Sequence, residues 1–83
     1  MWGLFRRRPP ALPLAGRVIW RLRKDNETAV AVLRDVPTMG RELRVTVQGR
    51  LYWSAVYAHG GQLEPMAAQH RSDFERLGWR AAT

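Results

Sequence analysis

The side chains that could support catalysis or metal binding are few in this chain, and their spacing does not combine them. His59 and His70 stand eleven positions apart in a sequence without cysteine, which is no recognised transition-metal spacing. Asp73 and Glu75 are two positions apart on an expected helix and point roughly 200° apart, so they cannot act together on one substrate. The "HGG" at 59–61 could form an oxyanion loop, but the sequence has no serine nucleophile elbow that would use it. We expect no enzymatic activity, no metal and no cofactor.

The basic residues carry the stronger signal, because their distribution is uneven. The net charge is +7, and residues 1–24 hold seven basic and no acidic residues, whereas residues 25–83 hold seven of each. Thirteen of the fourteen basic residues are arginine. The planar guanidinium suits paired contacts with carboxylate or phosphate, although a GC-rich genome would also enrich arginine. The excess charge therefore belongs to the start of the chain and its first expected strand.

The first residues, "MWGLFRRRPP", combine aromatic side chains, a leucine, three arginines and two prolines. Three prolines and a glycine lie between residues 8 and 16, and they favour an extended segment. We predict an extended tail at 1–16, one domain at 17–80 and a disordered C-terminus at 81–83. No signal peptide or run of about 18 apolar residues is recognised, so we expect a cytoplasmic protein.

Alternating side chains predict a hairpin after the tail. In "RVIWRLRK", Val18, Trp20 and Leu22 share one face and the arginines share the other, and only Ile19 breaks the pattern. "TAVAVLRDV" follows as a second strand, across a turn at Asp25 and Asn26.

A second hairpin is expected in "RELRVTVQGRLYWSAVYA". A two-residue turn at Gln48 and Gly49 would set each apolar row against a polar row. We therefore predict a three-residue loop at 47–49 with a left-handed glycine, which places Val45 opposite Leu51 and Leu43 opposite Trp53.

After "HGG", the spacing of the apolar residues changes from every second residue to the 3.6-residue period of an amphipathic helix. The residues on the apolar stripe are Leu63, Met66, Ala67, His70, Phe74 and Leu77. Gly78 suits a left-handed C-terminal cap, with Trp79 folding back onto Phe74. The fold class is α+β: a small two-layer domain with an antiparallel four-stranded sheet (ββββα) packed on one C-terminal helix. The other sheet face is expected to carry Arg17, Ile19, Arg21, Arg23, Glu42, Arg44, Thr46, Tyr52, Ser54 and Val56.

Residues 42–79 resemble the ends of small uncharacterised bacterial proteins, in which a hairpin such as "ELRVTVQGRLYWS" precedes a helix closing on "GW". The resemblance implies architecture and bacterial origin and transfers no functional site. The expected order of strands and helix is also similar in topology to transcriptional regulators of the Whirly kind, which bind single-stranded DNA.

Two binding hypotheses follow, and a protein partner with an acidic or apolar groove is favoured. The tail would dock there as an accessory subunit of a larger assembly, through Trp2, Leu4, Phe5, Arg6, Arg7 and Arg8. The alternative is single-stranded nucleic acid on the basic sheet face, bound by Arg17, Arg21, Arg23, Lys24 and Arg44 with Tyr52 stacking on a base. An anionic membrane surface is a weaker second alternative, and self-association is left open.

Overall fold

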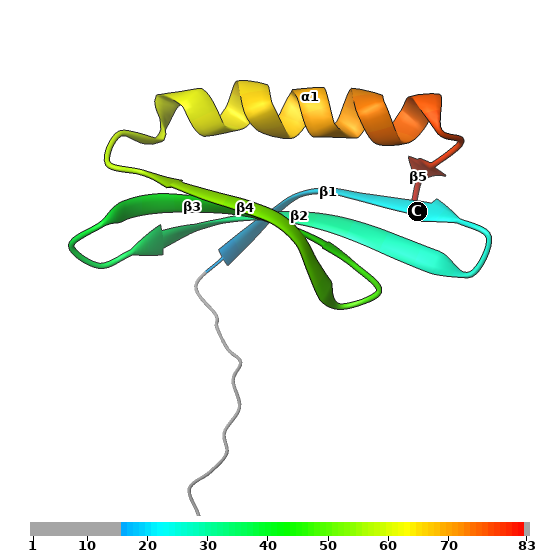
Figure 1. Cartoon of the computed structure of the whole chain (residues 1–83), viewed down its shortest axis with the longest axis horizontal. Coiled ribbons are helices and arrows are strands. Elements are labelled where there is room, and N and C mark those ends of the chain that lie inside the picture. Colours follow the sequence, from blue (N-terminus) through cyan, green and yellow to red (C-terminus); the bar gives the residue numbers. More distant parts are fainter. Residues whose placement is uncertain (1–15, 83) are drawn as a thin grey trace, which may run out of the picture.

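The computed structural model describes residues 16–82 as one antiparallel sheet covered on one face by a single long helix (Figure 1). The strand order is β4-β3-β2-β1-β5, so the first four strands form a meander and the last strand returns beside the first. The elements are β1 (Gly16–Lys24), β2 (Glu27–Val36), β3 (Gly40–Val47), β4 (Arg50–Tyr57), the short 3₁₀ turn η2 (Gly60–Gln62), α1 (Leu63–Arg76) and β5 (Arg80–Ala81).

This architecture confirms the predicted α+β class, with four main antiparallel strands and one helix near the C-terminus. The prediction lacked one strand. β5 pairs with the outer side of β1, where Ala81 lies opposite Leu22 and Arg80 lies opposite Arg23. The amide of Ala82 also donates to the carbonyl of Arg21 at 3.0 Å. The helix is thus tied at its far end to the strand that it covers.

Residues 1–15 lie outside the described part of the chain. The predicted tail contacts of Trp2, Leu4, Phe5 and the arginines at 6–8 therefore stay predictions. The described chain starts at Gly16, the first residue of β1. Within residues 16–82, no helix has both the length and the apolar character that crossing a membrane requires.

The core lies between the sheet and α1, and aliphatic and aromatic side chains fill it. The indole Nε1 of Trp20 donates to the backbone carbonyl of Ala67 at 2.8 Å, which fixes the helix over β1. Leu22, Leu33, Leu43, Leu63 and Val45 are fully buried. The other buried apolar residues are Trp20, Ala29, Ala31, Ala67, Phe74 and Trp79.

A β-bulge at Ile19 corrects the predicted faces of β1. Val18 pairs with Val32 while Trp20 pairs with Ala31, so Ile19 is the extra residue. An extra residue reverses the alternation of everything before it. Val18 is therefore 47% exposed on the uncovered face, and Arg17 lies on the helix side, contrary to prediction. Ile19 itself packs partly against the core rather than on the uncovered face.

The second hairpin differs from the prediction in a related way. Its loop has two residues, Gln48 and Gly49, with φ of 54° and 78°, the paired positive values of a type I′ turn. The predicted three-residue loop is wrong. A bulge at Tyr52, rather than a longer loop, brings the apolar residues of β4 opposite those of β3. Val45 consequently pairs with Trp53, and Leu51 pairs with Thr46.

Two further expectations for this hairpin are overturned by the same bulge. Leu43 lies opposite Ala55 rather than opposite Trp53. Leu51, predicted to lie opposite Val45 on the apolar side of the hairpin, is instead 57% exposed.

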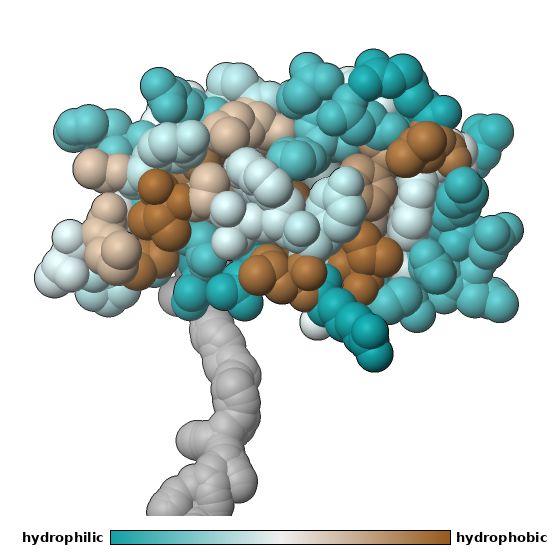
Figure 2. Space-filling view, in the orientation of Figure 1, coloured by the Kyte–Doolittle hydropathy of each residue, from teal (hydrophilic) through white to brown (hydrophobic). Residues whose placement is uncertain are grey.

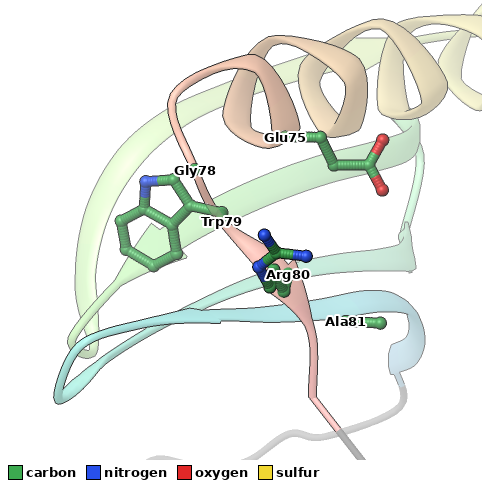
Figure 3. Close-up of a pocket in the computed structure, with 5 residues that line it drawn as sticks. All are labelled: Glu75, Gly78, Trp79, Arg80 and Ala81. Carbon is green, nitrogen blue, oxygen red and sulfur yellow. The ribbon is translucent and has the colours of Figure 1, made fainter.

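The end of α1 confirms the predicted left-handed cap. Gly78 has φ of +100°, its amide donates to the Glu75 carbonyl at 3.0 Å, and the Trp79 amide donates to the Phe74 carbonyl at 3.1 Å. The rings of Phe74 and Trp79 meet edge to face, with centroids 5.2 Å apart. In Figure 3 the indole lies beneath the end of the helix and Glu75 points the other way. Leu77, predicted in the core, is 66% exposed because the helix has ended at Arg76.

A candidate partner-binding face

The open face is the surface of the sheet that α1 does not cover. Residues that lie directly opposite one another in a sheet share a face, so the pairing of the strands defines its members. Val18, Val32, Arg44 and Ser54 form one row across the four main strands, and Arg21, Val30, Thr46 and Leu51 form the next. Further members are Gly16, Arg23, Thr28, Arg34, Val36, Gly40, Glu42, Val56 and, on β5, Arg80.

Aliphatic side chains occupy the middle of the open face. Val30 and Val32 lie half-buried on the central strand β2. Around them, Val18, Leu51 and Val56 have exposed fractions of 47%, 57% and 38%. Antiparallel sheets with one free face usually place polar side chains there. An apolar centre on the uncovered side is therefore the feature that makes this face a candidate binding surface.

The arginines of the open face surround this apolar centre. Arg21 pairs with Val30 across β1 and β2, and Arg44 pairs with Val32 across β2 and β3. Arg34 lies two positions beyond Val32 on β2. Among the described residues, five arginines and one glutamate lie on this face, which gives a net charge of +4. Such a surface is complementary to one with apolar side chains at its centre and negative charge around them.

Glu42 holds two of these arginines in place. Its Oε1 accepts a hydrogen bond from Nε of Arg34 at 2.5 Å, and its Oε2 accepts one from a terminal nitrogen of Arg44 at 3.3 Å. The glutamate is only 5% exposed, although it lies on the uncovered face. The two arginine side chains remain 41% and 44% exposed. The cluster thus presents two oriented guanidinium groups to solvent over one shielded carboxylate.

The ionisation of Glu42 follows from these contacts. Burial of the carboxyl acts to raise the pKa of Glu42, but the hydrogen bond from Arg34 and the positive charges of both arginines outweigh it. The net result is a pKa below the usual value of 4.5. Glu42 is therefore a carboxylate at neutral pH and can form ion pairs with Arg34 and Arg44.

The structure brings together only half of the residues predicted to bind nucleic acid. Arg21, Arg23 and Arg44 share the open face. Arg17 instead pairs with Glu64 of the helix at 3.5 Å.

The other two predicted residues lie elsewhere for clear physical reasons. Nζ of Lys24 donates to the Leu77 carbonyl at 2.6 Å, where it satisfies the C-terminal end of α1. The bulge turns Tyr52 towards the helix, so that its ring meets Phe74 edge to face with centroids 5.3 Å apart. Within residues 16–82, the open face consequently carries no aromatic side chain.

Sequence reasoning placed Val56 on the open face but missed Arg34 and the other aliphatic residues of the centre. A signal was present in β2, "ETAVAVLRDV", which is apolar at both phases of its alternation. Ala29, Ala31 and Leu33 fill the core, while Val30 and Val32 face away from it. A strand that is apolar on both faces is typical of a sheet whose two faces are both covered by other elements or by a partner.

The residues with acid–base potential are not brought together. The imidazole of His70 packs against the indole of Trp53, with centroids 4.4 Å apart. His59 lines a hollow of about 290 Å³ together with Tyr57 and Gln62. In the described part of the chain, no group of three or more histidine, cysteine, aspartate or glutamate residues is placed to hold a metal ion.

Comparisons with known proteins add no assignment. Neither the protein-family models, nor the curated proteins, nor the solved structures give a significant match. The geometry of the chain alone therefore has to support any functional proposal.

Proposed function

We propose that this protein is a small non-enzymatic interaction module, an accessory subunit that binds an acidic partner protein through the open face of its sheet. The observation that carries the proposal is the aliphatic centre of Val18, Val30, Val32, Leu51 and Val56 inside a rim of arginines. Interfaces with this anatomy bury an apolar centre and keep a charged rim that fixes orientation.

The charge of the face supports an acidic partner over the other occupants. A second copy of the same face would bring a second excess of arginine, and the two surfaces would repel each other. The N-terminal residues Arg6–Arg8 carry the same sign. We propose that these arginines, together with Trp2, Leu4 and Phe5, extend the contact with the acidic partner.

Single-stranded nucleic acid is the second candidate, supported by the five arginines that share the open face. Phosphate contacts alone give binding with a steep salt dependence. Base stacking is the usual second component of single-strand binding, and an aliphatic centre supplies none of it. This difference favours the protein partner.

Site-specific photo-crosslinking in the native host tests the proposal. A photoreactive residue at Leu51 on the open face should capture one acidic protein after nuclease treatment, and the same group at Gln69 on the outer side of α1 should not. Arg21→Glu should abolish the capture, whereas the matched charge reversal Arg76→Glu on the helix should leave it intact.

Three outcomes would contradict the proposed function. Loss of capture on nuclease treatment would assign the face to nucleic acid, which a labelled single-stranded oligonucleotide would confirm by its salt slope of roughly −0.7 per neutralised phosphate. Equal capture from both positions would deny any role of the open face. Capture that survives Arg21→Glu but is lost on deletion of residues 1–15 would place the contact in the tail alone.

A further inference from the structure

The outer strand β4 is a free sheet edge. In the order β4-β3-β2-β1-β5, β4 pairs with β3 on one side and with no other described strand. Its eight residues, Arg50–Tyr57, therefore present one row of backbone amide and carbonyl groups to solvent. At the opposite edge, β5 already covers part of β1. Such an edge is a template for another strand.

β4 also lacks most of the devices that usually protect an edge. Its stretch from Leu51 to Tyr57 contains no charged residue and no proline, and its one irregularity is the bulge at Tyr52. Three of the six large hydrophobic residues that are exposed in the described chain lie on this strand: Leu51, Tyr52 and Val56. β4 runs along the front of the molecule in Figure 1, and Figure 2 shows hydrophobic side chains between the polar ones on this side.

We propose that β4 pairs antiparallel with β4 of a second copy of this chain. Strand pairing uses backbone groups that every sequence has, so the side chains decide which partner is tolerated. The stretch from Leu51 to Tyr57 is uncharged, so two copies of it meet without repulsion. The two open faces would lie side by side in one continuous sheet rather than against each other, which keeps their arginines apart.

The regular part of β4 sets the register of this pairing. Beyond the bulge, Trp53 to Tyr57 pair with β3 without a shift, and Ala55 is the centre of that stretch. A twofold axis at Ala55 places Trp53 of one copy opposite Tyr57 of the other on the helix side. It places Ser54 opposite Val56 on the open side. Both pairs keep each residue on its observed face, as direct cross-strand neighbours must.

Self-pairing would double the proposed docking surface, but it stands on a different observation and can fail separately. The full chain at micromolar concentration should have a mass of twice 9.6 kDa by sedimentation or light scattering. Ser54→Lys places two like charges near the axis and should weaken the dimer roughly tenfold or more. Val18→Lys adds the same charge on β1, where the residue is 47% exposed, and should leave the dimer unchanged.

A cysteine experiment tests the register directly, because the natural sequence contains no cysteine. Ala55→Cys should form an intermolecular disulfide under mild oxidation, since opposite Cβ atoms in a sheet approach disulfide range. Ser72→Cys, on the exposed side of α1, should not exceed the rate of random collision. Circular dichroism of each variant checks that the fold is retained. A monomeric full chain, equal weakening by both lysine variants, or equal cross-linking of both cysteines would overturn the proposal.

Discussion

Replacing Glu42 by glutamine tests the cluster that orients Arg34 and Arg44 over the open face. Glutamine has nearly the same shape and keeps one oxygen acceptor, but it removes the negative charge. A hydrogen bond to a charged group contributes about 1.5–3 kcal/mol when it is shielded. Because both guanidinium groups are more than 40% exposed, solvent screening reduces this contribution. We expect the free energy of unfolding at pH 7 to fall by about 1–2 kcal/mol for the two contacts together.

The pH dependence of this loss follows from the direction of the pKa shift. The pKa of Glu42 is lower in the folded protein than its usual value of 4.5, so folding favours the ionised carboxyl. Its contribution to stability is complete above that value and is lost as the pH falls through the lowered folded pKa. Glutamine does not titrate. The stability curves of the natural protein and the Glu42→Gln variant should therefore converge below pH 4.5.

Urea unfolding followed by circular dichroism between pH 7 and pH 3 measures the difference. Glu64→Gln is the control, because its pair with Arg17 spans 3.5 Å between side chains that are 64% and 63% exposed. That change should shift the free energy of unfolding by less than about 0.5 kcal/mol. A Glu42→Gln penalty that stays constant over the whole pH range would show that shape, and not charge, holds the cluster.

The turns of the two central hairpins give three further tests by urea unfolding. Gly40→Ala should cost roughly 3 kcal/mol or prevent folding, since φ is +122° and the new Cβ would lie 2.1 Å from the Tyr57 carbonyl oxygen. Gly49→Ala should cost only about 1–2 kcal/mol, because φ is +78° but nothing lies within 4 Å, and a penalty equal to that of Gly40→Ala would refute the clash. Gln48→Ala should cost about 1 kcal/mol, since Oε1 accepts from the Thr28 amide at 2.7 Å, and a silent change would remove that contact.

The sequence predicted the strands and the helix because each has a clear period, but it could not predict the bulges. In β1 the one residue that breaks the alternation, Ile19, is the residue that bulges. Read on one strand alone, such a break is an ordinary imperfection. A bulge is a mismatch of two residues against one, so it is defined only once the partner strand and its register are known.

The second hairpin shows the same limit in a different form. Its two apolar rows are out of phase across a two-residue turn, and either a longer loop or a bulge can repair this. From the sequence pattern alone, we predicted the longer loop. The chain uses the bulge, which allows Tyr52 to pack against Phe74 and leaves Gln48 free to bond Thr28. Both contacts join residues distant in sequence, which explains why the turn chemistry alone could not decide.

The chemistry of the open face depends on that one extra residue in β4. With the predicted three-residue loop in place of the bulge, Tyr52 would lie opposite Arg44 on the open face, which is the arrangement of an aromatic stacking platform within basic charge. With the bulge, Leu51 takes that side of the strand and the tyrosine ring joins the helix layer. Leucine and valine cannot stack on a base, but they can fill a complementary apolar surface. A local backbone irregularity is therefore one reason to propose a protein partner rather than nucleic acid, while the arginines that would serve either one stay in place.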